Sequence, residues 1–189
     1  MTLADIIDSI GNYQIRAISD SMLSNLKEWR NAQMDVLRQN RILTDEDQQR
    51  WWSSLKNNDD QVQFGLYTVT PQPALIGYGG LVYLNFEYKR AEVSFLLDPK
   101  RAAVRETYRA DLCAAFTLFL RYGFERLGLH RVYTETFGFR DEHIAILEDF
   151  GLRREGVFRD HVFKKGRFWD SILHGMLRSE WDALQLGGK

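Results

Sequence analysis

Hydrophobic residues follow two different periods along the chain, and these periods divide it into predicted strands and helices. Runs in which apolar residues alternate or directly follow one another predict strands. These runs cover residues 13–17, 63–70, 74–84, 91–97, 131–137, 157–164 and 168–177. Apolar residues spaced three or four positions apart predict helices at about residues 20–30, 44–55, 107–127 and 141–150.

The order of these elements predicts an α/β fold. A strand at 91–97, a long helix at 107–127 and a strand at 131–137 follow one another directly. Such a unit requires a right-handed crossover, which makes its two strands parallel. We therefore expect an α/β (α+β mixed sheet) architecture, in which helices flank a central mixed sheet within a single domain over residues 1–189.

Individual residues mark the ends of two helices and the two faces of one strand. Thr44 and the acidic residues after it are typical of a helix start, and Gly151 suits the position after a helix end. Successive side chains of a strand point to opposite faces. In the strand 91–97, one face takes Ala91, Val93, Phe95 and Leu97, and the other takes Glu92, Ser94 and Leu96.

Three glycines, Gly77, Gly79 and Gly80, lie close together in the predicted strand 74–84. Glycine-rich segments bind phosphate groups where a strand turns into a helix. This segment lies inside a strand instead, so a β-bulge is the better interpretation.

Composition and charge exclude several classes of protein. The chain is 44% hydrophobic and 27% charged, as is usual for a globular domain. Its net charge of −1 provides no overall attraction to nucleic acid or to an anionic membrane. The longest apolar stretch, 112–120, is much shorter than the roughly 20 residues of a membrane span. The first ten residues carry two aspartates and no basic group, unlike a secretory leader. We expect a cytoplasmic protein without nucleic-acid or membrane partners.

Cysteine and histidine usage adds two exclusions. Cys113 is the only cysteine, so no internal disulfide is possible and a reducing compartment fits. Cys113 and the four histidines do not have the spacing of metal ligands, so we expect no metal.

Several segments together resemble one enzyme superfamily. The segments AEVSFLLDP (91–99), FERLGLHRV (124–132), YTETF (133–137) and GLRREG (151–156) resemble the GNAT superfamily of acetyl-CoA-dependent N-acetyltransferases. The segment EGVFRDHVFKKGRFWDS (155–171) is similar to the branch of ribosomal-protein N-terminal and spermidine acetyltransferases. The resemblance covers about residues 13–178, which we take as the core of the domain.

The front half of the chain resembles a narrower group. Trp-Arg-Asn at 29–31 and VLRQNRILTDEDQQRWW (36–52) are similar to acetyltransferases of surface-polysaccharide and nonulosonic-acid synthesis. That resemblance implies a primary amine on a nucleotide-linked amino sugar as the acceptor. Protein N-terminal or polyamine acetylation is the first alternative, and a GNAT fold that binds acyl-CoA without turnover is the second. Relatives also form homodimers, which the sequence itself does not decide.

The resemblance implies acetyl-CoA as the acyl donor and indicates where it binds. Two parallel strands that splay apart leave backbone groups with which the pantetheine arm can pair, and the next helix offers its N-terminus to the pyrophosphate. The cofactor-binding residues expected on this basis are Ser94, Phe95, Leu96, Arg101, Arg105, Tyr108, Arg109, Ala110 and Arg140.

The expected pyrophosphate loop departs from the family pattern, Arg-x-x-Gly-x-Gly/Ala. No glycine occurs between Gly80 and Gly123, and the motif positions fall on Thr107, Ala110 and Leu112. Four cations lie in the ten residues 100–109, namely Lys100, Arg101, Arg105 and Arg109. Their charges could take over part of the glycine cradle through charge-assisted hydrogen bonds, and a solvated basic loop is the alternative.

Aminolysis of a thioester needs a base for the amine, oxyanion donors and an acid for the thiolate. Glu92 is the first candidate for the base, with Glu135 second and His143 third. A merely structural pairing of Glu92 with Arg90 or Arg131 is the alternative. Backbone N–H groups near Phe95 are the expected oxyanion donors.

The sequence does not identify the residue that protonates the departing thiolate. Leu147 occupies the position of the usual tyrosine, and Arg140 occupies the position of the usual asparagine. His143, Tyr133 and Tyr108 are the remaining candidates.

The acceptor residues are expected in an aromatic and polar helix-loop-helix and on nearby strands. These residues are Trp29, Arg30, Asn31, Gln39, Trp51, Tyr78 and Tyr83. Trp can stack on a sugar or a base and Arg can pair with a diphosphate. Packing in the hydrophobic core is the alternative for the tryptophans and tyrosines.

Overall fold

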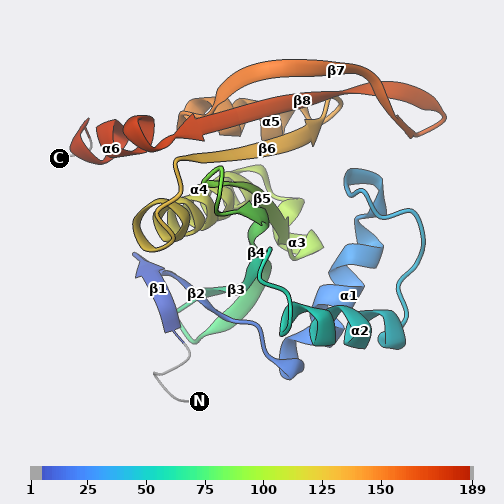
Figure 1. The fold of residues 1–189 in the computed structure, drawn as a ribbon. Helices are drawn as coiled ribbons and strands as arrows, with labels where there is room; N and C mark the ends of the chain where they lie inside the picture. Colours follow the sequence, from blue (N-terminus) through green and yellow to red (C-terminus); the bar gives the residue numbers. More distant parts are fainter. Residues whose placement is uncertain (1–5, 188–189) are drawn as a thin grey trace. The chain divides into compact units, whose positions relative to one another are not determined.

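The computed structural model describes residues 6–187 (Figure 1). The strands are β1 (Ile6–Ile10), β2 (Tyr13–Ala17), β3 (Val62–Thr68), β4 (Ala74–Asn85), β5 (Arg90–Leu97), β6 (Arg131–Phe137), β7 (Arg153–Lys164) and β8 (Arg167–Leu177). The helices are α1 (Leu23–Ala32), α2 (Asp45–Leu55), α3 (Pro99–Ala102), α4 (Arg105–Arg121), α5 (Asp141–Phe150) and α6 (Arg178–Gly187). A π-helical turn, Tyr122–Arg126, extends α4. Among the helices within residues 6–187, none combines the length and the apolar character needed to cross a membrane.

The predicted α/β mixed sheet is confirmed. Eight strands within the described residues form one sheet in the order β1-β2-β3-β4-β5-β6-β8-β7. The β5–β6 pair is parallel, as the predicted crossover requires, and Glu92 lies opposite Tyr133 in its register. The hydrophobic pattern did not predict β1, α3 or α6, and the predicted start of α4 lies two residues too late.

The chain divides into two compact units. One comprises the residues up to Val82 together with Ser94–Phe119, and the other comprises Tyr83–Val93 and the residues from Leu120 onward. The predicted single domain over residues 1–189 stays a prediction.

In the first unit, helices cover both faces of strands β2 to β5. On one face, residues from α1, β3, β4 and β5 form a hydrophobic cluster, against which α2 packs. The cluster consists of Ile18, Met22, Leu23, Leu26, Trp29, Tyr67, Tyr78 and Leu96. On the other face, Phe116 and Phe119 of α4 pack against Phe95 and Phe64. Phe95 and Leu96 therefore point to opposite faces of β5, as predicted.

The glycine-rich segment of β4 allows a very close approach of β5. The register against β3 skips one residue of β4 between Leu75 and Gly77, which confirms the predicted bulge. A Cβ atom on Gly79 would lie 2.2 Å from the carbonyl oxygen of Ser94, and one on Gly77 would lie 2.7 Å from that of Leu96. These glycines therefore serve strand packing, because any side chain there would collide with backbone.

Capping residues define the start of α2 and the end of α5, the two helix ends that single residues predicted. Thr44 and Asp47 form a capping box at the start of α2, in which each side chain accepts from the other residue's backbone N–H. Gly151 ends α5 in the left-handed region at φ 109°, where glycine carries no steric penalty. Both helix ends were predicted correctly from these residues.

In the second unit, β8 lies between β6 and β7, and the β7–β8 hairpin extends beyond the shorter β6 (Figure 1). The π turn after α4 packs against α6, where Phe124 stacks on Trp181 with ring centroids 5.9 Å apart. Arg131 of β6 forms a bidentate ion pair with Glu155 of β7. A Cβ atom on Gly175 of the intervening β8 would lie 2.5–2.6 Å from this pair, so glycine lets the ion pair cross the middle strand.

Candidate functional site

The backbone of β5 has one edge that faces β4 and one that does not. The N–H of Asp98 donates to the carbonyl of Ile76 at 2.8 Å, and the carbonyls of Ser94 and Leu96 lie against the β4 glycines. Because backbone groups alternate between the two edges of a strand, those of Phe95 point away from β4. The resemblance places the pantetheine contact on this edge.

A side chain binds the same edge one position past the expected pantetheine contact. Gln33, just after α1, donates from Nε2 to the carbonyl oxygen of Leu97 at 2.8 Å. The last carbonyl of β5 is therefore bound by a side chain of the α1–α2 segment. This arrangement fits a pantetheine arm that pairs at Phe95, although the splay of β5 from β6 stays a prediction.

The turn from β5 into α4 is helical. The side chain of Asp98 caps α3 by accepting from the N–H of Lys100 at 2.8 Å. The N–H of Tyr108 donates to the carbonyl of Val104 at 2.8 Å, so Val104 occupies the N-cap position of α4. Its side chain offers no acceptor to the N–H groups of the first turn. An anion such as a pyrophosphate suits such an end.

The structure corrects the register of the expected pyrophosphate motif. Because α4 begins at Arg105, Ala110 and Leu112 lie inside the helix, and Leu112 is only 1% exposed. Leu112 is therefore core, and Ala110 is not at the helix start. The N–H groups of the first turn belong to residues around Arg105 and Thr107.

Arg101 is held by a buried carboxylate. Its Nε and Nη2 donate to Asp111 at 2.7 and 2.8 Å, and the hydroxyl of Tyr13 donates to the same carboxylate at 3.0 Å. Burial, together with Asp111, raises the pKa of Tyr13 to about 12, so the phenol keeps its proton. Because its guanidinium is bound to Asp111, Arg101 is a poorer candidate for direct contact with the pyrophosphate. For the exposed Arg105 and Arg109 and for the half-buried Tyr108, cofactor binding stays a prediction.

The candidate bases lie on neighbouring strands of the second unit. Glu92 is 8% exposed on β5, and Glu135 lies half-buried on β6 with His161 3.7 Å away. The two arginines that the sequence offered as structural partners of Glu92 have other contacts in the structure. Arg131 binds Glu155, and Arg90 lies over the ring of Tyr88.

His143 lies on the buried face of α5. Burial holds the pKa of His143 well below its usual value, and Arg140 and His174 add to the effect. His143 is therefore uncharged at neutral pH, which suits a proton acceptor better than the acid for the thiolate. Arg140 is the half-buried N-cap residue of α5, and Leu147 is a core residue.

The second buried histidine, His174 of β8, lies beside the carboxylate of Glu148. The two groups are 3.2 Å apart, and Arg154 binds the same carboxylate at 2.8 Å. The imidazole is fully buried, and desolvation lowers the pKa of His174 in spite of the nearby acids Glu148 and Glu155.

These two histidines predict a loss of stability on mild acidification. The pKa values of both His143 and His174 are lowered in the folded chain, whereas a histidine of the unfolded chain titrates near pH 6.5. The unfolded state therefore binds more protons below this pH, and the free energy of unfolding falls as the pH drops from 7 to 5. Two protons set a limiting slope of about 2.7 kcal/mol per pH unit.

Urea unfolding at a series of pH values measures this slope. We expect His174→Gln to reduce the slope, whereas the matched change His161→Gln, at an exposed histidine, has a smaller effect. A slope that stays the same in His174→Gln contradicts the assignment.

The aromatic acceptor candidates of the first unit belong largely to the core. Trp29 and Tyr78 are buried members of the hydrophobic cluster, and Trp51 packs edge-on against Tyr78 with ring centroids 6.2 Å apart. In the second unit, Tyr83 is 59% exposed and adopts a positive φ of 52°, which is uncommon for a residue other than glycine.

The polar acceptor candidates form a network that braces the connection between α1 and α2. Asn31 donates to the carbonyl of Leu43 at 3.0 Å and accepts from its N–H at 2.9 Å, as a neighbouring strand would. Gln39 donates to Asn31 and to the carbonyl of Arg41, both at 2.8 Å. Nε of Arg30 donates to Gln39 at 3.1 Å. Asn31 and Gln39 thus shape the connection through bonds within it.

Asn31→Ala is expected to lower the free energy of unfolding by about 1–3 kcal/mol, because Gln39 and the backbone of Leu43 lose their partner. Chemical unfolding measures the change. Asn40→Ala, at an exposed position of the same connection, is the matched control and should alter stability by less than about 0.5 kcal/mol. Equal effects of the two substitutions contradict the bracing role.

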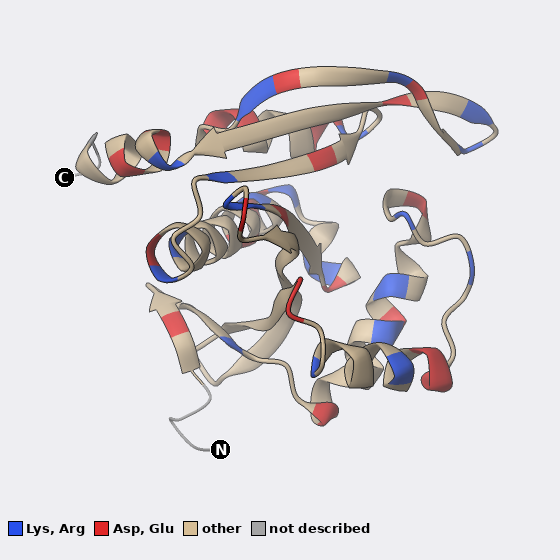
Figure 2. Ribbon diagram, in the orientation of Figure 1, with Lys and Arg blue, Asp and Glu red and all other residues tan. Residues whose placement is uncertain are grey.

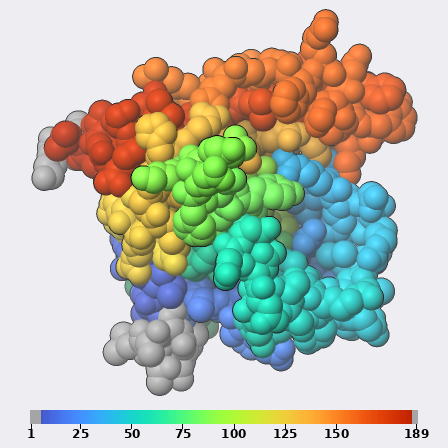
Figure 3. Space-filling model, viewed as in Figure 1, coloured from blue at the N-terminus to red at the C-terminus, as the bar shows by residue number. Residues whose placement is uncertain are grey.

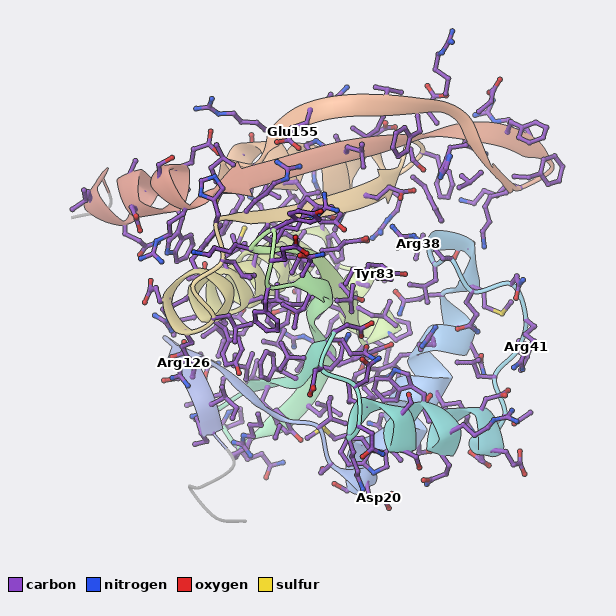
Figure 4. The ribbon with its side chains drawn as sticks, viewed as in Figure 1. Asp20, Arg38, Arg41, Tyr83, Arg126 and Glu155 are labelled. Carbon is purple, nitrogen blue, oxygen red and sulfur yellow. The ribbon has the colours of Figure 1, made fainter. Side chains whose placement is uncertain are left out.

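The last turn of α1 and the connection that follows it are rich in arginine, and three acidic residues come next, at the start of α2. Residues 30–43 contain three arginines, Arg30, Arg38 and Arg41, and one acidic residue, Asp35. Arg41 pairs with Asp47, and the hydroxyl of Tyr78 forms a hydrogen bond with Arg30. Figure 2 shows basic and acidic residues along this part of the chain, Figure 4 labels Arg38 and Arg41, and the connection lies on the molecular surface in Figure 3.

Sequence reasoning missed three residues at this site: Tyr13, Gln33 and Asp111. Asp111 did carry a signal, because a carboxylate directly before the apolar run 112–120 needs a partner when it is buried. Nothing in the local sequence distinguishes Gln33 or Tyr13. No group of three or more metal-binding side chains occurs in the part of the chain that the structure describes.

Comparison with known proteins assigns the family. Residues 15–173 match the family described as acetyltransferase (GNAT) domain. Over 141 residues the chain is 24% identical to the uncharacterized N-acetyltransferase YnaD of Bacillus subtilis, covering 75% of this chain and 78% of that protein. A second relative is the prophage-derived uncharacterized N-acetyltransferase YokL of Bacillus subtilis, 34% identical over 82 residues (42% of this chain, 46% of YokL).

Solved structures agree on the fold. The spermidine N-acetyltransferase of Vibrio cholerae, in complex with CoA and spermine, superimposes with a TM-score of 0.80 at 19% identity, covering 90% of this chain and 98% of that one. With a family match over residues 15–173, the chain belongs to the GNAT family and is an N-acetyltransferase that uses acetyl-CoA.

Proposed function

We propose that this enzyme transfers the acetyl group of acetyl-CoA to the primary amine of a small anionic acceptor, an amino sugar carried on a nucleotide. The observation that carries the proposal is the excess of arginine in residues 30–43, which contain three arginines and one aspartate. Arg41 is paired with Asp47, so Arg30 and Arg38 are the arginines that we assign to the diphosphate. The resemblance assigns this region to the acceptor. A guanidinium pairs well with a diphosphate, because its planar fork matches two oxygens.

The bracing network supports this proposal. Arg30 is half-buried, and its bonds to Gln39 and Tyr78 hold the guanidinium in place. A cation whose geometry is fixed before binding costs less conformational entropy when a ligand arrives. Arg38 lies exposed in the same connection (Figure 4) and completes a basic region for the diphosphate.

The proposed chemistry assigns one proton acceptor and one oxyanion donor. Glu92 takes a proton from the ammonium group, and the neutral amine attacks the thioester carbonyl. A C–N bond forms, the C–S bond breaks, and coenzyme A leaves as the thiolate, which then gains a proton. The backbone N–H of Phe95 stabilises the oxyanion that forms in between.

Polyamine acetylation is the principal rival, because the Vibrio cholerae neighbour is a spermidine N-acetyltransferase. A polyamine is a polycation and is attracted to carboxylates. The excess of arginine in residues 30–43 opposes that acceptor and favours an anionic one.

A free-thiol assay with acetyl-CoA and a panel of acceptors tests the proposal. We expect a nucleoside-diphosphate amino sugar to exceed spermidine and an N-terminal peptide at least 100-fold in kcat/KM. Arg38→Glu should raise the KM of the amino sugar at least tenfold and leave that of acetyl-CoA unchanged. Arg126→Glu, at an exposed arginine of the second unit, is the matched control. A preference for spermidine overturns the proposal, and acetyl-CoA binding without transfer to any acceptor supports a binding module instead.

A further inference from the structure

The corner between β5 and α4 is built from backbone hydrogen bonds. The carbonyl of Asp98 accepts from the N–H groups of Arg101 and Ala102 at 3.0 and 2.9 Å. The N–H of Val104 then donates to the carbonyl of Arg101 at 3.1 Å, immediately before α4 begins at Arg105. The chain thus enters α4 through a short helical turn, where the family pattern has a glycine-rich loop.

Three side chains from three elements hold this corner. Arg101 of α3 binds Asp111 of α4 through two hydrogen bonds, and Tyr13 of β2 donates to the same carboxylate. The side chain of Asp111 is fully buried, and that of Arg101 is 32% exposed. Asp111 therefore receives three hydrogen bonds away from bulk water. We call Tyr13, Arg101 and Asp111 the corner clamp.

We propose that the corner clamp positions the acyl donor, by holding α3 against α4 so that the first-turn N–H groups of α4 meet the pyrophosphate of acetyl-CoA. The proposal rests on the use of acetyl-CoA and is independent of which amine accepts the acetyl group. Tyr13, Arg101 and Asp111 are positioning residues, because they act through the backbone of the corner.

Two physical arguments support a positional role. In a glycine-rich loop, backbone N–H groups can approach a phosphate closely. Without glycine, the first turn of α4 must itself be held at the correct distance from the pyrophosphate. A displacement of the helix start by about 1 Å would weaken its hydrogen bonds to the pyrophosphate. In addition, a buried ion pair adds little to stability compared with apolar residues of similar volume. Stability alone is therefore a poor explanation for the clamp.

The test separates position from stability. Arg101→Met leaves the buried Asp111 without its ion partner, and Asp111→Leu leaves Arg101 and the hydroxyl of Tyr13 without their acceptor, so both single variants should melt at lower temperature. The double variant R101M/D111L replaces the ion pair by apolar side chains and should recover most of the melting temperature. We expect the double variant to keep kcat within threefold of wild type, while the KM of acetyl-CoA and the calorimetric Kd of coenzyme A rise at least tenfold.

A shorter acyl donor distinguishes a positioning role from a purely structural one, because only a positioning role affects the two donors differently. Acetyl-pantetheine lacks the pyrophosphate, so its KM should be the same in the wild type and in R101M/D111L. A double variant that folds and binds coenzyme A like the wild type overturns the proposal, and so does an equal rise for both donors.

Two milder variants keep the proposal falsifiable if the double variant does not fold. Arg101→Lys keeps the positive charge and loses the bidentate hydrogen bonding to Asp111, and Tyr13→Phe removes one hydrogen bond to Asp111. Each should raise the Kd of coenzyme A two- to fivefold with little change in melting temperature. Wild-type affinity in both overturns the proposal, whereas a wild-type enzyme that binds no coenzyme A refutes the donor assignment itself.

Discussion

Replacing Glu92 by Gln is expected to lower kcat by a factor of about 10² to 10⁴, the usual contribution of a general base. Gln has nearly the same shape and cannot take the amine proton. Glu92 is almost fully buried on β5, within three residues of the expected oxyanion donor Phe95. The KM of acetyl-CoA should change less than threefold, because the carboxylate acts on the amine. Steady-state kinetics with a free-thiol assay measure both constants.

The pH profile and a matched variant sharpen this prediction. In the wild type, kcat/KM should rise with pH as the base loses its proton, and this limb should disappear in Glu92→Gln. Glu135→Gln, on the adjacent β6, is the control and should reduce kcat less than tenfold. A loss of activity in Glu135→Gln with a wild-type Glu92→Gln would move the base to Glu135.

Gly79→Ala is expected to lower the free energy of unfolding much more than the addition of a methyl group at a glycine with open space beside it. The new Cβ would lie 2.2 Å from the carbonyl oxygen of Ser94 and 3.0 Å from the Cα of Phe95. Both are backbone atoms, so the strands themselves have to move apart. Overpacking typically costs about 1–3 kcal/mol, and we expect the upper end of this range because the clash is with backbone. Chemical unfolding measures the loss.

The matched control for Gly79→Ala is another strand glycine with room beside it. A Cβ on Gly156 of β7 would meet only the side chain of Leu173, at 3.8 Å, an ordinary contact. Gly156→Ala should therefore alter the free energy of unfolding by less than about 1 kcal/mol. If the two substitutions prove equally mild, β4 and β5 do not approach each other as closely as described. Gly79→Ala should also weaken acetyl-CoA binding, because it displaces the segment that carries Phe95.

Much of the fold was predictable, because its strands and long helices carry regular hydrophobic periods. The parallel β5–β6 pair followed from the strand-helix-strand order, and the caps at Thr44 and Gly151 followed from single residues. Short elements escaped prediction. The helix α3 has only four residues, which is too few for a periodic signal, and its start depends on a cap by Asp98.

The candidate site was less predictable, because its polar residues are defined by partners far away in the sequence. Arg101 was expected on the pyrophosphate, but Asp111, ten residues later, binds it. Asn31 was expected on the acceptor, whereas its side chain binds the backbone of Leu43. A local pattern indicates which chemical groups are present, and tertiary structure decides which of them are already engaged.

A competition experiment distinguishes an anionic acceptor from a polyamine. The enzyme is given acetyl-CoA with equal concentrations of a nucleoside-diphosphate amino sugar and spermidine, and mass spectrometry identifies the acetylated product. The charge of residues 30–43 predicts that the acetyl group appears on the amino sugar. The role of Glu92 predicts that Glu92→Gln forms this product more slowly, in proportion to its lower kcat. Acetylated spermidine as the main product would contradict the account.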